Sequence, residues 1–99
     1  MIKHIILWKL REDIPEEEKA SCRAEAKRRL EGLNGRIDGL LRIEVKTDGL
    51  ASSSADMMLD SDFSDEEALK GYQTNPLHLE AAGYVRSIVA QRLCLDFEA

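Results

Sequence analysis

The first eleven residues constrain the fold more than any other segment, because they read as a strand that is apolar on both sides. With the two-residue period of a strand, one side carries Ile2, His4, Ile6, Trp8 and Leu10. The other side carries Ile5 and Leu7 between charged residues. A strand with apolar groups on both sides is typically central in its sheet and covered on each face. We therefore expect residues 2–11 to form a central strand.

The following segments predict a helix and two strands. A helix is expected over residues 14–31, because Pro15 suits the first helical position and Glu16 begins an acidic run near the positive end of the dipole. Strict alternation of apolar and polar residues predicts a strand over residues 40–47. Its inward side is expected to hold Leu41, Ile43, Val45 and Thr47. A third strand is expected over residues 55–63, after a serine-rich loop.

The last third of the chain reads as two helices and a strand. Ser64, followed three residues later by Glu67, forms a capping box that predicts the start of a short helix. The dipeptide Asn75-Pro76 breaks that helix and begins a longer one, with the asparagine as its cap. Alternation predicts a final strand over residues 92–97.

This order of elements predicts one domain over residues 1–99, of the α+β class. Strand, helix, strand, strand, helix, strand is the order of the ferredoxin-like βαββαβ sandwich, with helices on one face of a four-stranded antiparallel sheet. The opposite face would carry Ile5, Leu7, Leu93, Leu95 and Phe97. That is too much contiguous apolar surface for a monomer in water. We therefore expect a homodimer that packs sheet against sheet.

Three aspartates alternate along the predicted third strand, on the side away from the helices. They are Asp56, Asp60 and Asp62. We expect them to pair with Lys9, Arg42 or Lys46 across strands or across the dimer, where such pairs set the register. A paired acid/base site is the alternative interpretation.

Composition excludes several classes of function. The net charge of −5 over 99 residues gives no support for a nucleic-acid or anionic-membrane partner. The longest apolar run has four residues, against the ~20 that span a bilayer. The chain starts directly in a strand-like segment without a signal-peptide pattern, so we expect a cytoplasmic protein. Cys22 and Cys94 are then expected to be reduced thiols without a disulfide.

Four stretches of the sequence resemble the stress-responsive A/B barrel family, also called Dabb or dimeric α+β barrel. They are residues 2–10 (IKHIILWKL), 63–69 (FSDEEAL), 72–78 (YQTNPLH) and 96–97 (DF). The resemblance covers nearly the whole chain. It implies a homodimer whose two sheets form a central barrel, and most members of the family have no assigned reaction.

One plant member of that family is a cyclase that closes a polyketide by aldol condensation, without a metal or an organic cofactor. The tyrosine and histidine of its pocket occupy the positions of Tyr72 and His78 here, and its first-strand histidine matches His4. The resemblance therefore implies a catalytic group of His78, Tyr72 and His4, with no cofactor.

The residues themselves are compatible with that chemistry. His78 falls in the first turn of the last helix, where the positive dipole end disfavours imidazolium and leaves a neutral base. A hydroxyl such as that of Tyr72 can stabilise an enolate oxygen. The structural alternative is that His78 pins the helix junction, that Tyr72 is a core ring, and that His4 is a satisfied core histidine.

Two classes of function remain open from the sequence. One is a homodimeric domain that holds a small apolar or carbonyl-containing ligand, with no assignable reaction. The other is a cofactor-independent enzyme of the polyketide cyclase or aldol-lyase type that uses the Tyr-His pair. A cofactor-free monooxygenase follows only from analogy of fold. The expected pocket lining is Ile6, Trp8, Leu59, Leu69 and Ala81. No metal site is expected, because two distant histidines and scattered carboxylates lack a recognised spacing.

Overall fold

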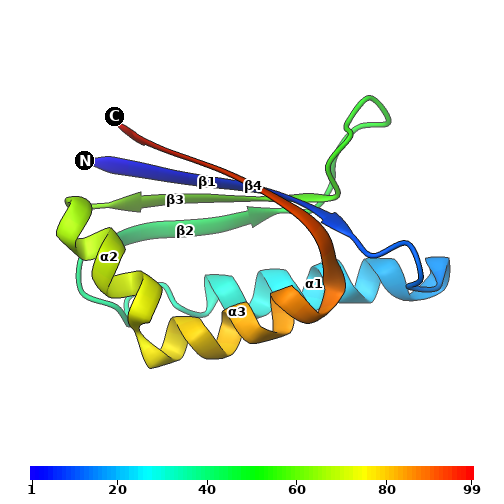
Figure 1. The fold of residues 1–99 in the computed structure, drawn as a ribbon, viewed down its shortest axis with the longest axis horizontal. Coiled ribbons are helices and arrows are strands. Elements are labelled where there is room, and N and C mark those ends of the chain that lie inside the picture. The colour runs from blue at the N-terminus through cyan, green and yellow to red at the C-terminus, as the bar shows by residue number, and fades with distance from the viewer.

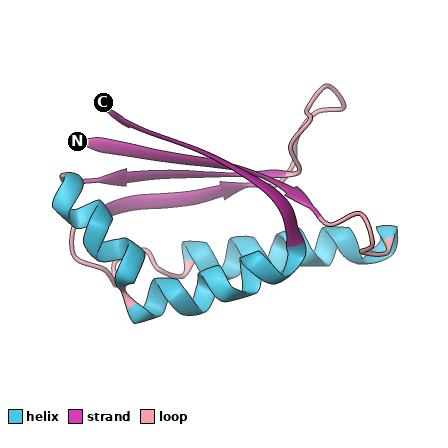
Figure 2. Ribbon diagram, viewed as in Figure 1, coloured by secondary structure: helices cyan, strands magenta, loops and turns pink.

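Four antiparallel strands form a sheet in the order β2-β3-β1-β4, and three helices cover one of its faces (Figures 1 and 2). The computed structural model describes all residues 1–99. Its elements are β1 (Ile2–Leu10), α1 (Glu16–Glu31), β2 (Leu40–Lys46), β3 (Met57–Phe63), α2 (Glu66–Thr74), α3 (Pro76–Ile88) and β4 (Val89–Glu98). This is the ferredoxin-like α+β fold that the sequence predicts. No helix combines the length and the apolar composition that a membrane crossing requires.

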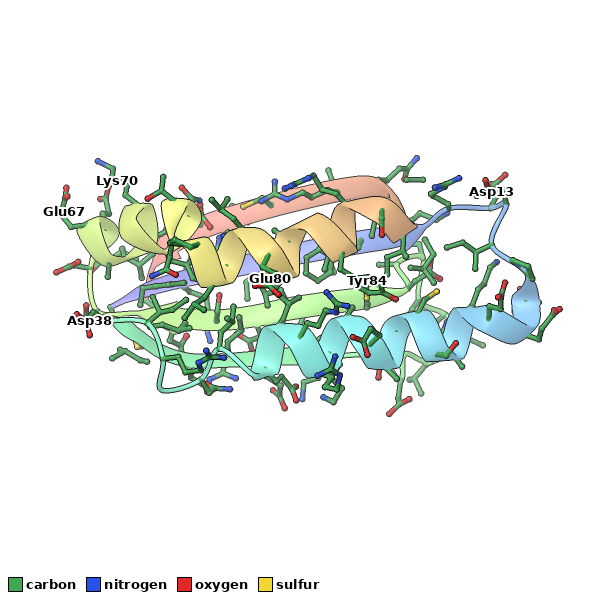
Figure 3. All side chains as sticks on the ribbon, turned by 90° about the horizontal axis from the view of Figure 1, so that it is seen from below. Asp13, Asp38, Glu67, Lys70, Glu80 and Tyr84 are labelled. Atoms are coloured by element: carbon green, nitrogen blue, oxygen red, sulfur yellow. The ribbon has the colours of Figure 1, made fainter.

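The predicted central position of the first strand is confirmed. β1 pairs with β3 on one side and with β4 on the other. Its inward residues are all buried, and Trp8 retains only 4% of its accessible surface. Seen from the helix side in Figure 3, α1 and α3 lie side by side across the sheet. The core therefore fills the space between this helical layer and the inner sheet face.

The helix starts agree with the sequence at α3 and differ from it at α1 and α2. The Asn75 side chain accepts a hydrogen bond from the Leu77 N–H, and Pro76 occupies the first position of α3. Pro15 instead stands one position earlier, as the N-cap residue without a side-chain capping hydrogen bond, so α1 begins at Glu16. The predicted Ser64 cap is wrong: Asp65 is the cap and accepts from the Ala68 N–H.

The physical reason for the Ser64 difference is a contact with the turn before β2. The Ser64 N–H donates to the Gly39 carbonyl at 2.9 Å, which holds residue 64 against that turn. The helix consequently starts one residue later than the capping box predicts.

A bulge in β2 overturns the prediction that Leu41 faces inward. Leu40 pairs with Phe63 and Arg42 pairs with Asp62, so Leu41 is an extra residue on β2 without a partner on β3. Leu40 is therefore buried, at 7% exposure, while Leu41 is 58% exposed. After the bulge, Ile43 and Val45 are buried as the alternation predicts. Thr47 lies beyond the end of the strand.

Gly39 allows the turn before β2 to approach α2 closely. Its φ of +81° lies in the left-handed region, which favours glycine. A Cβ atom at this position would stand 2.3 Å from the Cβ of Ala68 on α2. The turn and the helix could not both keep their places around a larger residue.

The outer face of the sheet divides into an apolar half and a charged half. The apolar half lies on β1 and β4, where Leu93 is 71% exposed, Leu95 64% and Phe97 44%. The charged half, here called the outer charge cluster, consists of Lys3, Arg42, Asp60 and Asp62.

Ion pairs within one chain neutralise the outer charge cluster, although the buried Asp62 Oδ1 lies outside ordinary hydrogen-bond geometry in its ion pair with Lys3. Lys3 Nζ lies 2.9 Å from Asp60 and 2.8 Å from Asp62, and Arg42 lies 2.8 Å and 3.1 Å from the same two carboxylates. Of the partners expected from the sequence only Arg42 takes part, because the register of β1 places Lys3 opposite Asp62. Asp56 instead accepts a hydrogen bond from the Leu10 N–H at 2.7 Å.

Candidate functional site

A cavity of about 250 Å³ lies between the inner sheet face and the helices α2 and α3. Its wall combines apolar side chains with two histidines, one tyrosine and two arginines. The polar members are His4, Tyr72, Gln73, His78, Arg86 and Arg92. A larger and more open hollow of about 520 Å³ lies beside the 47–56 loop, but its wall holds no histidine or tyrosine. Both histidines of the chain line the smaller cavity, which makes it the candidate site for acid/base chemistry near neutral pH.

The expected apolar lining is partly present in the cavity wall. Ile6, Trp8 and Leu59 belong to it. Leu69 and Ala81 are buried in the core and do not reach it. The wall on α3 is formed instead by the neighbouring Ala82 and by Val85. Periodicity identifies the buried side of a helix, but it does not show which buried residue borders a cavity.

Tyr72 presents a buried hydroxyl without a hydrogen-bond partner. The residue lies in the last turns of α2 and is 1% exposed. Its Oη makes no hydrogen bond within the chain. Burial raises the pKa of the Tyr72 hydroxyl far above its usual range, against the opposing charge of Arg92. At neutral pH this group is therefore a protonated donor with nothing to donate to.

His78 presents a second unpartnered group next to that hydroxyl. It is the third residue of α3, half-buried, and its Nδ1 is buried without a hydrogen-bond partner. Burial lowers the pKa of His78 and outweighs the opposing effect of the Gln73 backbone, while the charges of Arg86 and Arg92 lower it further. The His78 and Tyr72 ring centroids are 4.0 Å apart. The neutral state expected from the helix start thus has burial as its main cause.

His4, in contrast, is buried with a partner. It is 2% exposed, and its Nδ1 is hydrogen-bonded to the Asp96 carboxylate, which lies directly opposite on β4. Its ring lies 6.2 Å from the Tyr72 ring in an edge-on arrangement. The three residues implied by the family resemblance therefore share one cavity wall, and His4 differs from Tyr72 and His78 in that its Nδ1 already has a partner within the chain.

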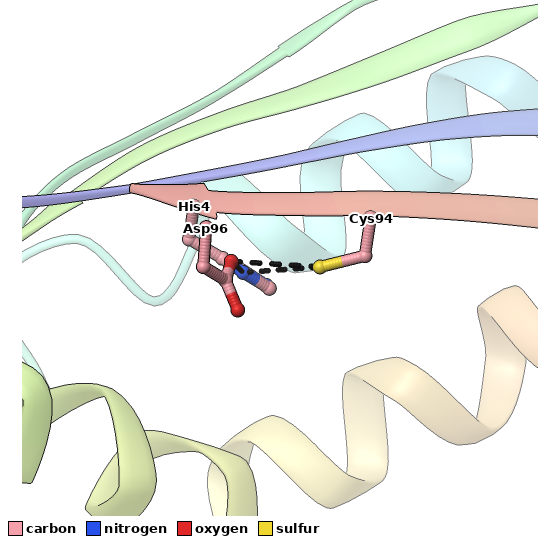
Figure 4. A group of neighbouring side chains, drawn as sticks. All are labelled: His4, Cys94 and Asp96. Atoms are coloured by element: carbon pink, nitrogen blue, oxygen red, sulfur yellow. Dashed lines mark hydrogen bonds and ion pairs between the residues drawn. The ribbon is translucent and has the colours of Figure 1, made fainter. Parts of the chain in front are cut away.

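Cys94 lies beside this His4–Asp96 pair (Figure 4). Its Sγ is 3.7 Å from His4 Nδ1 and 3.5 Å from Asp96 Oδ1. Sequence spacing did not suggest the group, because its members come from opposite ends of the chain. The signal that could have found it is the strand order of the predicted fold, which places the last strand next to the first.

Two arginines make the cavity electropositive. Arg86 from α3 and Arg92 from β4 both belong to the wall, and neither has an ion-pair partner in the chain. No carboxylate belongs to the wall. A neutral base, a hydroxyl donor and two free cations together suit a ligand with a carbonyl oxygen and a negative charge.

Comparison with known proteins identifies relatives over the full length. The family model described as Stress Responsive A/B Barrel Domain matches residues 2–99. A dimeric protein of unknown function with a ferredoxin-like fold from Bacteroides fragilis is 33% identical, with a TM-score of 0.91, over 99% of this chain and 95% of that chain. The chain matches no curated protein.

Two more distant solved structures share the fold. A dimeric ferredoxin-like protein of unknown function from Thermobifida fusca is 22% identical, with a TM-score of 0.79, over 99% of this chain and 90% of that chain. A hydroxynitrile lyase from Passiflora edulis is 13% identical, with a TM-score of 0.71, over 97% of this chain and 90% of that chain. The same backbone thus occurs in proteins of unknown function and in an enzyme.

Proposed function

Because the chain belongs to the stress responsive A/B barrel domain family, we propose that it is a homodimer in which each protomer binds a small carbonyl compound in the 250 Å³ cavity. One observation carries the ligand proposal: the Tyr72 hydroxyl and His78 Nδ1 are both buried without a partner. Buried polar groups are hydrogen-bonded in nearly all native structures. A ligand carbonyl, which accepts from Tyr72, and a ligand proton, which His78 accepts, would supply what the chain lacks.

The dimer proposal rests on the apolar half of the outer sheet face. Leu93 and Leu95 are more than half exposed there, and a stable pair would remove such groups from water, burying roughly 1,200–2,000 Å² in total. The Bacteroides fragilis relative is itself described as dimeric. Sheet-to-sheet packing would leave the helix-covered cavity of each protomer intact.

Sedimentation tests this arrangement. The wild type is expected at twice the 11.2 kDa chain mass, and Leu95→Glu at the single mass, because a carboxylate cannot be buried in the contact. Leu79→Glu is the matched control, since Leu79 is 46% exposed on α3, away from the outer sheet face. A wild type that sediments as a monomer at micromolar concentration excludes the dimer.

Binding can be measured without knowing the natural ligand. Trp8 is the only tryptophan and belongs to the cavity wall, so its fluorescence reports occupancy. Keto acids from pyruvate to phenylpyruvate carry both the carbonyl and the negative charge that the wall suits. We expect Tyr72→Phe to weaken their binding by ~5–100-fold, the effect of one lost hydrogen bond. Tyr84→Phe, whose ring lies outside the wall under Arg29, is the control. If both variants bind as the wild type does, or if no keto acid quenches Trp8, the ligand proposal fails.

A second candidate function is catalysis at the bound ligand, of the cofactor-independent cyclase or lyase type. It is favoured by the placement of a neutral His78 and a protonated Tyr72 with ring centroids 4.0 Å apart. His78 would take a proton from the carbon next to the carbonyl, and Tyr72 would donate a hydrogen bond to the enolate oxygen. The Passiflora edulis hydroxynitrile lyase is a lyase with the same fold, which supports the reaction class and no particular substrate.

Hydrogen exchange of the keto acid in heavy water tests this step directly. NMR follows the loss of the protons on the carbon next to the ketone, and the protein is expected to accelerate this exchange. A keto acid that binds at Trp8 but exchanges no faster than it does in buffer would leave a binding protein and exclude the catalytic candidate.

We place this function in the cytoplasm, with no membrane or nucleic-acid partner. Both cysteines are free thiols, as reducing compartments maintain them. The net charge of −5 opposes attraction to nucleic acids and anionic lipids. Fractionation of the native host with an antibody against the chain tests the location, and recovery in the secreted fraction contradicts it.

A further inference from the structure

We propose that His4, Cys94 and Asp96 form a binding site for a zinc-class divalent transition metal at the edge of the cavity. The site uses groups other than the Tyr72–His78 pair, so it stands whether or not the protein binds a carbonyl compound. The three possible ligand atoms, one from each residue, lie within 4.8 Å of one another.

The pairing of β1 with β4 creates this cluster. In the register of the two strands, His4 lies opposite Asp96 and Ile6 lies opposite Cys94. Because Cys94 and Asp96 are two residues apart, they project from the same face of β4. Figure 4 shows the three side chains gathered on the side of the sheet that faces α2 and α3.

The distances match the edges of a tetrahedral site. Bond lengths of ~2.3 Å to sulfur and ~2.0 Å to nitrogen or oxygen place sulfur about 3.5–3.6 Å from either lighter ligand atom. The Cys94 Sγ stands 3.7 Å from His4 Nδ1 and 3.5 Å from Asp96 Oδ1. Two of the three edges are thus already formed without a metal.

The third edge requires one hydrogen bond to open. His4 Nδ1 and Asp96 are now directly bonded, whereas two light ligands of one tetrahedral metal stand about 3.3 Å apart for such bond lengths. Asp96 can make this adjustment because its side chain is 37% exposed. His4 is the fixed ligand, since its buried ring lies edge-on to Phe63 and Tyr72 at 6.1 Å and 6.2 Å.

The donor set and the surroundings indicate the kind of metal. Thiolate, imidazole and carboxylate are the three ligand types that zinc accepts in proteins. Three protein ligands leave a fourth position for water, as in catalytic zinc sites. The exposed positions of Cys94 and Asp96 give the ion a route from solvent, and His4 belongs to the cavity wall. Binding would release the Cys94 thiol proton and would move the Nδ1 proton of His4 to Nε2 or to water.

Cobalt is the probe for this site, because a thiolate bound to Co²⁺ gives a charge-transfer absorption band. The experiment uses the full wild-type chain without a histidine tag, reduced and free of chelators. We expect one Co²⁺ per chain, a thiolate band at saturation, and displacement of that band by an equal amount of Zn²⁺. Zn²⁺ should also raise the melting temperature, because it binds the folded state.

Matched variants assign the ligands. Cys94→Ser should abolish the band and weaken Zn²⁺ binding by more than the ~10–100-fold typical of changes outside the first ligands. Cys22→Ser removes the other free thiol and should leave both measurements unchanged. Asp96→Asn keeps the size of the side chain and should weaken binding while the band persists. Circular dichroism confirms that each variant is folded.

Three results would overturn the proposal. One is a folded wild type that binds no Co²⁺ or Zn²⁺ at millimolar concentration. The second is a band that survives Cys94→Ser, or that Cys22→Ser abolishes. The third is a Zn²⁺ affinity that neither Cys94→Ser nor Asp96→Asn changes. In each of these cases the His4–Asp96 pair is a structural hydrogen bond, and Cys94 is not a metal ligand.

Discussion

The outer charge cluster and the inner cavity lie on opposite faces of the same sheet, and both contain polar groups. The two regions differ in whether those groups have partners within the chain. In the outer charge cluster each carboxylate meets two cations within 3.1 Å. In the cavity, the Tyr72 hydroxyl and His78 Nδ1 make no hydrogen bond within the chain. The paired groups complete the fold by themselves. The unpaired groups are complete only with something that the chain does not contain.

The pKa directions repeat this contrast. Hydrogen bonds from Lys3 and Arg42 lower the pKa of Asp62 despite burial, and for Asp60 the same two partners outweigh a large opposing effect of burial. In the cavity, burial itself dominates, raising the pKa of Tyr72 and lowering that of His78. The outer charge cluster thus stabilises charged forms, and the cavity stabilises neutral ones. A charge network suits structure, whereas a neutral acid and a neutral base suit proton transfer.

The largest expected effect is on catalysis in the cavity. His78→Ala should slow the exchange of keto-acid α-protons by ~10²–10⁴-fold, the usual contribution of a general base. Its melting temperature should fall moderately, because the ring that packs against Tyr72 is lost although its Nδ1 made no hydrogen bond. Glu80→Ala, an exposed change on the same helix, should retain the full rate. If His78→Ala accelerates keto-acid proton exchange as much as the wild type does, the unpartnered groups of the cavity have no catalytic role that separates them from the outer charge cluster.

The next effect concerns stability on the outer face. Arg42→Met should lower the free energy of unfolding by about 1–2 kcal/mol, more than an isolated surface pair and less than a buried one. The reason is that Arg42 contacts Asp60 and Asp62, whose side chains are only 21% and 13% exposed. Urea unfolding measures the change, and Arg36→Met, at an exposed arginine without an ion pair, provides the baseline. Equal free energies of unfolding for the two variants would show that the ion pairs of Arg42 do not stabilise the protein.

Acid should dismantle the outer charge cluster selectively. A carboxyl whose pKa is lower in the folded state stabilises the protein above its unfolded pKa and loses that contribution as the pH falls through the folded value. The pKa values of Asp60 and Asp62 are both lowered, so their contribution should be complete at pH 7 and decline below about pH 4. The double variant Asp60→Asn/Asp62→Asn should therefore differ most from the wild type near neutrality. A gap that stays constant into acid contradicts this linkage.

The smallest expected effect is the stability change at Tyr72. Tyr72→Phe keeps the packed ring, which lies 4.9 Å from the Phe63 ring, and removes a hydroxyl that has no partner. The free energy of unfolding should therefore stay within about 0.5 kcal/mol of the wild type or rise slightly. Thermal and urea unfolding both measure it. A loss of 2 kcal/mol or more (about the full cost of an unsatisfied buried group) would show that the hydroxyl is already bonded within the protein.

The fold could be predicted from the sequence where a local pattern and the global packing agree. The two-residue period of β1 identified its buried side, and the Asn75-Pro76 dipeptide fixed the start of α3. Two of the errors in local structure, at Leu41 and Ser64, come from contacts between segments. A bulge set by pairing with β3 turns Leu41 outward, and the carbonyl of Gly39 holds Ser64 out of the helix.

The candidate site could be predicted only in part. Tyr72, His78 and His4 came from a resemblance to a family, and the structure places all three in one wall. Asp96 and Cys94 depend on the register between the first and the last strand, which no local pattern encodes. In the sequence, Arg86 and Arg92 cannot be told apart from ordinary surface arginines. Only the cavity in the folded structure shows that both belong to its wall.

Gly39 allows the turn before β2 to lie close to α2, the helix that carries Tyr72 in the cavity wall. Two independent constraints meet at this residue, the left-handed backbone and the 2.3 Å separation from Ala68 that an added Cβ would have. Ala68 lies one helical turn before Tyr72 on α2, so any side chain at position 39 would push against the helix that sets the depth of the Tyr72 hydroxyl. In a library of random substitutions selected for ligand binding, position 39 should therefore admit glycine alone, although it lies outside the cavity wall.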